Sequence, residues 1–255
     1  MKFWGCICLA LILMLWGAKS ASAGQLANRL EQFPAWDSKP SVEAADGGDL
    51  VYPDWMAGTW EVTSTLEEMV APLAPELVTP GFEGNRPYLH QPVKFQVRFV
   101  EKNVRVGLPG SLLQTASLAV VAEREFNGLQ IARAYLGDRA VLSVKVDPNN
   151  TNRQITQLQG DGQLISTVTG RASETPAPHQ FIATEITQQV FRGDSQIYLN
   201  EVETTTAYQQ LESTEIEADQ VTAIYLSPQD PDYFAARKHP VALYRYRLVL
   251  SRPEY

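Results

Sequence analysis

Long segments of alternating apolar and polar residues constrain the fold of this chain more than any other feature. In residues 93–99, apolar residues at the odd positions alternate with Lys94, Gln96 and Arg98, and residues 59–66 repeat the pattern. Because successive side chains of a strand point to opposite faces of its sheet, this alternation predicts strands with one buried face. The chain is therefore expected to be mainly β.

Further segments of strand character follow, separated by turns rich in Gly, Pro, Asn and Asp. They are residues 141–146, 153–158, 163–170, 179–192, 196–209, 213–226 and 241–251. We expect an antiparallel meander of about eight to ten strands. Such a meander closes into a β-barrel, because closure removes the edges that a long open sheet would expose.

Residues 117–136 interrupt this strand pattern. Apolar residues recur there every three or four positions, Ser117 can cap the start of a helix and Gly137 can end it. Gly128 disfavours a helix by about 1 kcal/mol, so the alternative is a pair of strands turning at Asn127 and Gly128. We expect one helix near 117–136.

Residues 1–23 have the pattern of a cleaved secretory leader. Lys2 precedes an apolar run over residues 3–17, and Ala21 and Ala23 form a small-residue cleavage site. The alternative is a membrane anchor, but the run is shorter than the roughly 20 residues that span a bilayer. We expect an exported protein with no stable membrane insertion after cleavage.

Composition bounds what the exported chain can do. Both cysteines, Cys6 and Cys8, lie in the leader, so disulfides and thiol chemistry are excluded after cleavage. The net charge of −8 argues against binding of nucleic acid or anionic lipid surfaces. The remaining length suits an N-terminal extension over 24–50 and one barrel domain over 51–255.

An aromatic segment opens the first clear strand and carries the structural signature Tyr52, Trp55, Gly58 and Trp60. We expect Trp60 to plug one end of the barrel, with an arginine of the last strand stacked on its ring. Arg245 is the preferred partner. Arg247, two positions further on, is the alternative.

The N-terminal extension contains an earlier copy of the aromatic-Pro-x-Trp pattern, at Phe33 and Trp36. Two large aromatic residues are unusual in a flexible tail, so we expect them to dock against the domain.

Residues 67–91 form a connection far longer than a hairpin needs, and loops of this length often bind ligands or act as lids. Phe82, Arg86, Tyr88 and His90 combine aromatic, cationic and imidazole groups that can recognise a planar or anionic ligand. The alternative is an ordered surface loop that covers one barrel end.

No catalytic or metal-binding motif is present. The three histidines lack metal-ligand spacing, and no nucleophile elbow, phosphate loop or dinucleotide fingerprint occurs. Glu215, Glu217 and Asp219 share one strand face and could hold calcium, but a solvated outer face explains them better. No catalytic residue, metal or cofactor is assigned, and an enzyme is the weakest hypothesis.

Several motifs carry a family resemblance. They are the run from Leu30 through Trp60, Phe-Asn-Gly and Ala-Arg-Ala-Tyr-Leu-Gly within residues 126–137, and the ending at residues 241–246. In these the chain resembles an uncharacterised family of cyanobacteria and plant chloroplasts, a domain of unknown function. The resemblance implies a thylakoid-lumen or periplasmic location and no known activity. A weaker likeness, through Gly58-x-Trp60, links the chain to lipocalins and other calycins.

Three functional hypotheses follow. The first is a carrier or sensor of a small apolar ligand, such as a pigment, lipid or tetrapyrrole, which requires a cavity of roughly 300 Å³ or more. The second is an interaction or assembly factor for a thylakoid membrane complex, suggested by the aromatic segments and by Tyr233 and Phe234. The third is an enzyme whose site is scattered over barrel strands.

Overall fold

The fold is described from a computed structural model. The structure describes residues 24–45, 48–77, 79, 81–106, 115–193 and 197–253. The predicted leader, residues 1–23, lies outside them.

The described chain is mainly β, as the alternation predicts. Its elements in chain order are α1 (Gln25–Glu31), β1 (Glu43–Ala44), β2 (Val51–Tyr52), the 3-10 helix η1 (Asp54–Met56), β3 (Gly58–Val70), the 3-10 helix η2 (Glu83–Tyr88), β4 (Pro92–Val106), β5 (Thr115–Ala122), α2 (Arg124–Leu136), β6 (Val141–Asp147), β7 (Asn150–Leu158), β8 (Gln163–Glu174), β9 (Gln180–Arg192), β10 (Ile197–Glu212), β11 (Glu215–Leu226) and β12 (Ala242–Ser251). No described helix is long and apolar enough to cross a membrane.

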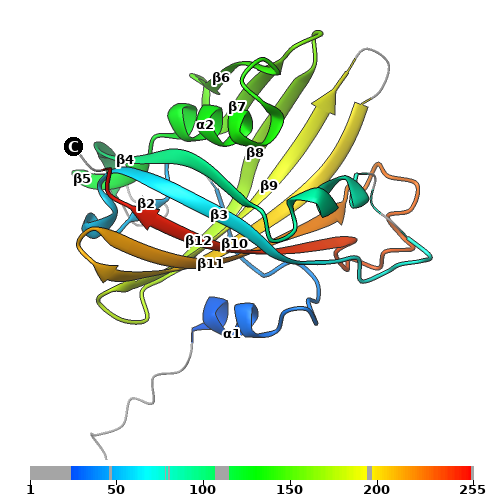
Figure 1. The fold of residues 1–255 in the computed structure, drawn as a ribbon, viewed down its shortest axis with the longest axis horizontal. Helices are drawn as coiled ribbons and strands as arrows, with labels where there is room; N and C mark the ends of the chain where they lie inside the picture. The colour runs from blue at the N-terminus through cyan, green and yellow to red at the C-terminus, as the bar shows by residue number, and fades with distance from the viewer. Residues whose placement is uncertain are drawn as a thin grey trace, which may run out of the picture.

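The strands form one antiparallel sheet in the order β2-β5-β4-β3-β12-β11-β10-β9-β8-β7-β6, and β1 pairs with β8. The long strands β3 to β12 follow the order of an up-and-down barrel: each pairs with its neighbours in sequence, and the first, β3, pairs with the last, β12. The pair β5 and β6 is the exception. No ladder joins β5 to β6 within the described residues. The predicted closed barrel is therefore not confirmed, and the sheet is a half-barrel (Figure 1).

Tyr52 shows how strongly the sheet curls. Its ring centroid lies 4.8 Å from that of Phe99 on β4 and 5.4 Å from that of Phe181 on β9. Four strands separate β4 from β9 in the sheet. In a flat sheet these strands would be about 24 Å apart, at ~4.8 Å per strand. Curling brings both onto one concave face.

Helix α2 lies along the gap between β5 and β6. It follows β5, precedes β6, and contacts both β4 and β6. Figure 1 shows it on the side of the sheet opposite α1. The helix takes the place of the turn that would have paired β5 with β6.

The predicted helix over 117–136 is correct only in its second half, because residues 115–122 form β5. A short apolar run fits a buried strand as well as a helix. Pairing with β4 makes this run a strand: the ladder extends from Phe99 opposite Ala122 to Val106 opposite Thr115. The helix ends at Leu136, as expected, and the next residue, Gly137, has a φ of 88°.

The N-terminal extension docks on the convex face of the sheet, as the aromatic residues predicted. Leu26, Leu30 and Trp36 are buried there against residues of β9, β11 and β12. Arg29 Nη2 donates a 2.7 Å hydrogen bond to the fully buried carboxylate of Glu203. The extension is therefore part of the folded domain.

Trp60, which the sequence predicted as a plug of one barrel end, is completely buried in the core with Met56 and Val62. The expected stacking partner was wrong. Arg252, just past β12, places its guanidinium 3.8 Å from the Trp60 ring centroid. Arg245 lies on the convex face, because residues of β12 alternate between faces and its cross-strand partner Val221 packs under α1.

Candidate functional site

The concave face of the half-barrel holds a cavity of about 310 Å³. Its walls come from alternate residues of β3, β4, β11 and β12, and Ile131 and Tyr135 of α2 cover it. Because each strand points every second residue inward, the alternation that builds the core also lines the cavity. Phe95, Phe99 and Leu248 supply much of the apolar surface.

The cavity also presents hydroxyl groups. Tyr52, Tyr208 and Tyr246 line it, together with Gln220 and Thr222 of β11. Within the described residues, neither the Tyr52 nor the Tyr246 hydroxyl has a hydrogen-bond partner. Unpartnered hydroxyls on an apolar wall can hydrogen-bond a bound molecule.

Burial extends the pH range over which these phenols stay neutral. It raises the pKa of Tyr208 to about 12 and the pKa values of Tyr52 and Tyr246 above their ordinary range. The nearby Tyr208 and Glu185 add to the increase in the Tyr52 pKa. A neutral phenol both donates and accepts hydrogen bonds, so the site suits a polar but uncharged group of a ligand.

The cavity roof is fixed by hydrogen bonds. The Tyr135 hydroxyl lies 3.2 Å from Ser64 Oγ on β3, which ties α2 to the opposite wall. Asn127 reinforces this: its Oδ1 accepts from the backbone nitrogen of Arg98 and its Nδ2 donates to the Arg98 carbonyl oxygen. These bonds hold α2 over the concave face.

A charged niche of about 40 Å³ adjoins the cavity and shares Tyr52 and Ala122 with it. Burial lowers the pKa of Arg124 and raises the pKa of the Glu185 carboxyl, which lies 3.4 Å from Arg171 Nε. The raised pKa of Glu185 means that its two arginine neighbours do not fully offset its burial. The niche makes one end of the cavity polar.

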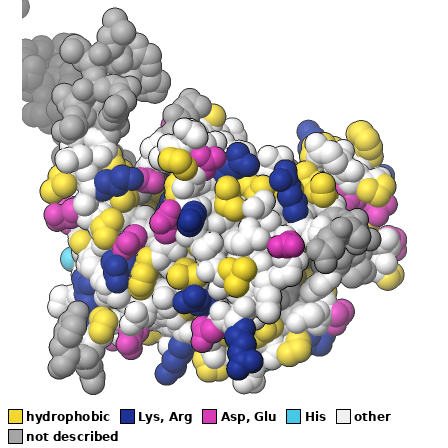
Figure 2. All heavy atoms as spheres, turned by 90° about the horizontal axis from the view of Figure 1, so that it is seen from above, with side chains coloured by type: hydrophobic (Ala, Val, Ile, Leu, Met, Phe, Trp, Pro, Cys, Tyr) yellow, Lys and Arg dark blue, Asp and Glu magenta, His cyan; other side chains and the backbone are white. Residues whose placement is uncertain are grey.

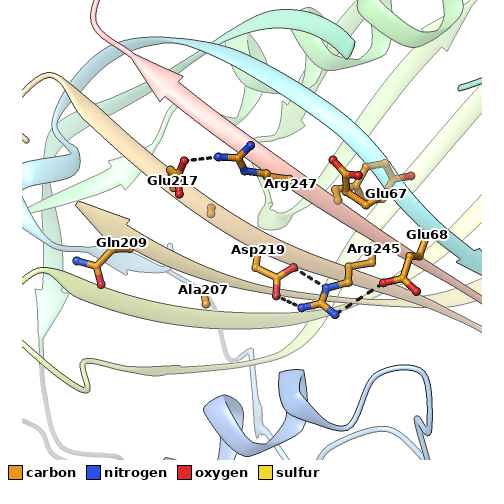
Figure 3. Close-up of a pocket in the computed structure, with 10 residues that line it drawn as sticks. Glu67, Glu68, Ala207, Gln209, Glu217, Asp219, Arg245 and Arg247 are labelled. Atoms are coloured by element: carbon orange, nitrogen blue, oxygen red, sulfur yellow. Dashed lines mark hydrogen bonds and ion pairs between the residues drawn. The ribbon is translucent and has the colours of Figure 1, made fainter. Parts of the chain in front are cut away.

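A larger groove, of about 590 Å³, lies on the convex face (Figure 3). Its charges are already paired: Arg245 donates to Asp219 at 2.8 and 3.0 Å and lies 3.9 Å from Glu68, and Arg247 pairs with Glu217. The groove is more open than the concave cavity, and small-molecule sites bury most of their ligand. We therefore take the concave cavity as the candidate site.

The four predicted lid residues do not come together around this cavity. Phe82 is buried against Tyr244, with ring centroids 5.8 Å apart. Tyr88 donates a 3.2 Å hydrogen bond to the carbonyl oxygen of Tyr135 and so contacts the cavity roof. None of the four lines the cavity itself.

Arg86 and His90 are exposed. Arg86 forms an ion pair with Glu83 within the same turn. His90 Nδ1 lies 3.6 Å from Glu67 Oε2, and its φ is 60°. Both side chains therefore have local partners in or beside the loop.

Two of the three carboxylates considered for calcium are paired with arginines, and Glu215 is not, within the described residues. Glu217 contacts Arg247, and Asp219 contacts Arg245. The described residues contain no cluster of three or more His, Cys, Asp or Glu side chains that could hold a metal ion. On the face shown in Figure 2, side chains of both charges are interspersed.

Sequence reasoning did not single out the polar residues of the cavity. Tyr208, Gln220, Thr222 and Tyr246 all occupy inward positions of strands that the sequence predicted. A polar side chain on the face that otherwise carries apolar residues is the signal that marks such positions.

Comparison with known proteins adds the family. Residues 44–254 match a family described as Domain of unknown function (DUF6816). No curated protein and no solved structure matches the chain. The matched region contains every strand that lines the cavity, together with α2. The chain therefore belongs to the DUF6816 family.

Proposed function

We propose that the half-barrel binds a small, mainly apolar molecule in its concave cavity. The observation that supports this most strongly is the 310 Å³ space itself, which reaches the roughly 300 Å³ where ligand sites begin. Aromatic walls favour a planar ligand through stacking. The hydroxyls of Tyr52 and Tyr246 favour one oxygen or nitrogen atom on that ligand.

Size narrows the ligand class. A cavity of about 150 Å³ holds one benzene ring. The space here is about twice that, which suits one or two rings or a short acyl chain. A tetrapyrrole has four rings and does not fit unless it extends out of the cavity. Among the classes considered, we favour a small pigment-like aromatic or lipid-derived molecule.

We also propose that binding takes place after export, in the thylakoid lumen or periplasm. The leader pattern at residues 1–23 and the resemblance to lumen-targeted proteins support this location. The Gly58 to Trp60 segment with Arg252 on its ring supports descent from a calycin-like barrel.

The test is to purify the protein from its native compartment and record its absorption spectrum and extractable small molecules by mass spectrometry. A bound molecule in about equimolar amount is expected. Thr222→Phe, which fills the cavity from β11, should abolish its recovery. Equal recovery with both proteins, or none with the unaltered chain, would contradict the proposal.

A second candidate is an interaction role at a membrane complex. Phe234 supports it, because 85% of its surface is exposed and Tyr233 packs against its ring edge. Trp36 does not contribute, since it is buried within the domain. Affinity capture from solubilised membranes should recover a complex subunit with the unaltered chain and lose it with Phe234→Ser. Equal recovery of that subunit by the unaltered chain and by Phe234→Ser would argue against the role.

A further inference from the structure

Glu174, the last residue of β8, has one carboxylate oxygen in use and one without a partner. Oε1 accepts a 3.0 Å hydrogen bond from the backbone nitrogen of Leu26, in the first turn of α1. Oε2 is buried and has no hydrogen-bond partner among the described residues. No described Lys, Arg or His side chain forms an ion pair with Glu174. A buried carboxylate oxygen without a partner is costly and calls for an explanation.

Gly24 lies directly beside this oxygen. A Cβ atom built on Gly24 would stand 1.8 Å from Glu174 Oε2 and 2.4 Å from its Cδ. The backbone nitrogen of Gly24 is two bonds from that Cβ position, so it is in the immediate neighbourhood of the carboxylate. Gly24 also follows Ala23, the end of the predicted cleavage site.

We propose that cleavage between Ala23 and Gly24 creates an α-ammonium group on Gly24 that forms an ion pair with Glu174 Oε2. The peptidase hydrolyses the bond between the Ala23 carbonyl carbon and the Gly24 nitrogen. Water supplies the hydroxyl of the new Ala23 carboxyl group, and the Gly24 nitrogen becomes an amine that is protonated at neutral pH. Before cleavage this nitrogen is an uncharged amide.

The ion pair fits the electrostatics of α1. An ammonium group at the start of a helix is normally unfavourable, because the helix dipole places partial positive charge there. Glu174 offsets that charge, since its carboxylate also accepts from the Leu26 backbone nitrogen. Removal of the leader would thus fix the start of α1, which carries Arg29 to the buried Glu203. This role does not depend on what the concave cavity binds.

The same geometry explains glycine at position 24. A side chain there would displace the Glu174 carboxylate, because its atoms already occupy the Cβ position. Glu174 could rotate away only by giving up its hydrogen bond to Leu26. Glycine at position 24 therefore lets the Glu174 carboxylate stay in place beside the new N-terminus.

Four proteins test the proposal. Two begin at Gly24 and carry either Glu174 or Glu174→Gln. The other two carry the same residues behind ten Gly and Ser residues, which move the ammonium group away. Gln keeps an acceptor for Leu26, so only the charge is removed. We expect Glu174→Gln to lower Tm by about 2–4 °C more in the chain that begins at Gly24 than in the extended chain.

Glu212→Gln is the matched control: Glu212 is exposed at the end of β10, so its replacement should change Tm by the same amount in both forms. A second measurement is the rate at which an amine-selective reagent labels the N-terminus. Labelling should be slow for the chain that begins at Gly24 and several-fold faster with Glu174→Gln. An equal Tm change in both forms, with labelling unaffected by Glu174→Gln, would overturn the proposal.

Discussion

Glu203 shows how single residues hold the extension to the sheet. Its fully buried carboxylate accepts hydrogen bonds from Arg29, Trp36, Tyr225 and Thr205. The charge and hydrogen bonds of Glu203 outweigh the burial of Arg29, so the pKa of Arg29 is raised. A buried carboxylate with this many donors depends strongly on its cation.

Arg29→Met should therefore lower the free energy of unfolding by about 3 kcal/mol, because it leaves a buried charge uncompensated. Chemical denaturation measures the change. Arg86→Met is the matched control, since it breaks an exposed pair with Glu83 and should cost less than about 1 kcal/mol. Equal costs for the two variants would show that the Glu203 network does not anchor the extension.

Tyr208 predicts a pH dependence at the residue scale. Its pKa is about 12 in the folded chain against an ordinary value near 10, so the folded state holds this proton more tightly. The stability that it contributes is complete below pH 10 and is lost as the pH rises through about 12. From pH 10 to 12 the free energy of unfolding should fall more steeply for the unaltered chain than for Tyr208→Phe, by about 2 kcal/mol. Parallel curves would contradict this.

The sequence predicted Trp60 as a buried plug but assigned it the wrong arginine. Gly58 has a φ of 109°, and a Cβ there would lie 2.2 Å from Arg252 Nη1. Glycine thus admits the guanidinium that covers Trp60. Sequence alternation fixes which face a strand residue takes, but it does not show that a residue beyond the strand folds back.

At the scale of elements, Gly128 sets how closely α2 approaches the sheet. A Cβ there would lie 2.6 Å from Gln154 Nε2 and 3.0 Å from Val144 Cγ1. In a free helix, replacing glycine with alanine stabilises by about 1 kcal/mol. Here the contacts with Val144 of β6 and Gln154 of β7 should make the same replacement destabilising.

Gly128→Ala should therefore lower the free energy of unfolding by about 1 kcal/mol, because α2 must move outward or its neighbours must shift. In a chain that also carries Val144→Ala and Gln154→Ala, the same change should be neutral or stabilising. Thermal or chemical denaturation of these chains measures both. A gain in stability from Gly128→Ala alone would mean that α2 does not pack this tightly.

The boundary between β5 and α2 is what the sequence could not place. Residues 118–122 are all apolar, so their pattern fits both a helix and a buried strand. The ladder with β4 settles the question, and that ladder depends on residues far away in the chain. Long-range pairing therefore overrode local periodicity.

At the scale of the whole molecule, the strand order was predictable and the closure was not. Alternation in segments such as residues 93–99 predicted a meander, and the pairing of β3 with β12 gives it the cyclic order of a barrel. Within the described residues no ladder joins β5 to β6: α2 fills their connection, and β2 pairs with the outer edge of β5. The helix that opens the barrel also roofs the cavity, so the site could not be located before α2 was placed.

The most direct test of the cavity is a fluorescence titration with 2-naphthol, which has two aromatic rings and one hydroxyl. The unaltered chain should bind one molecule saturably. Thr222→Phe should weaken binding at least tenfold, because its ring would occupy the cavity. Thr63→Phe places the same ring on the opposite face of β3 and should leave binding unchanged. No saturable binding by the unaltered chain, or equal binding by Thr222→Phe, would contradict the assignment of the concave cavity as a ligand site.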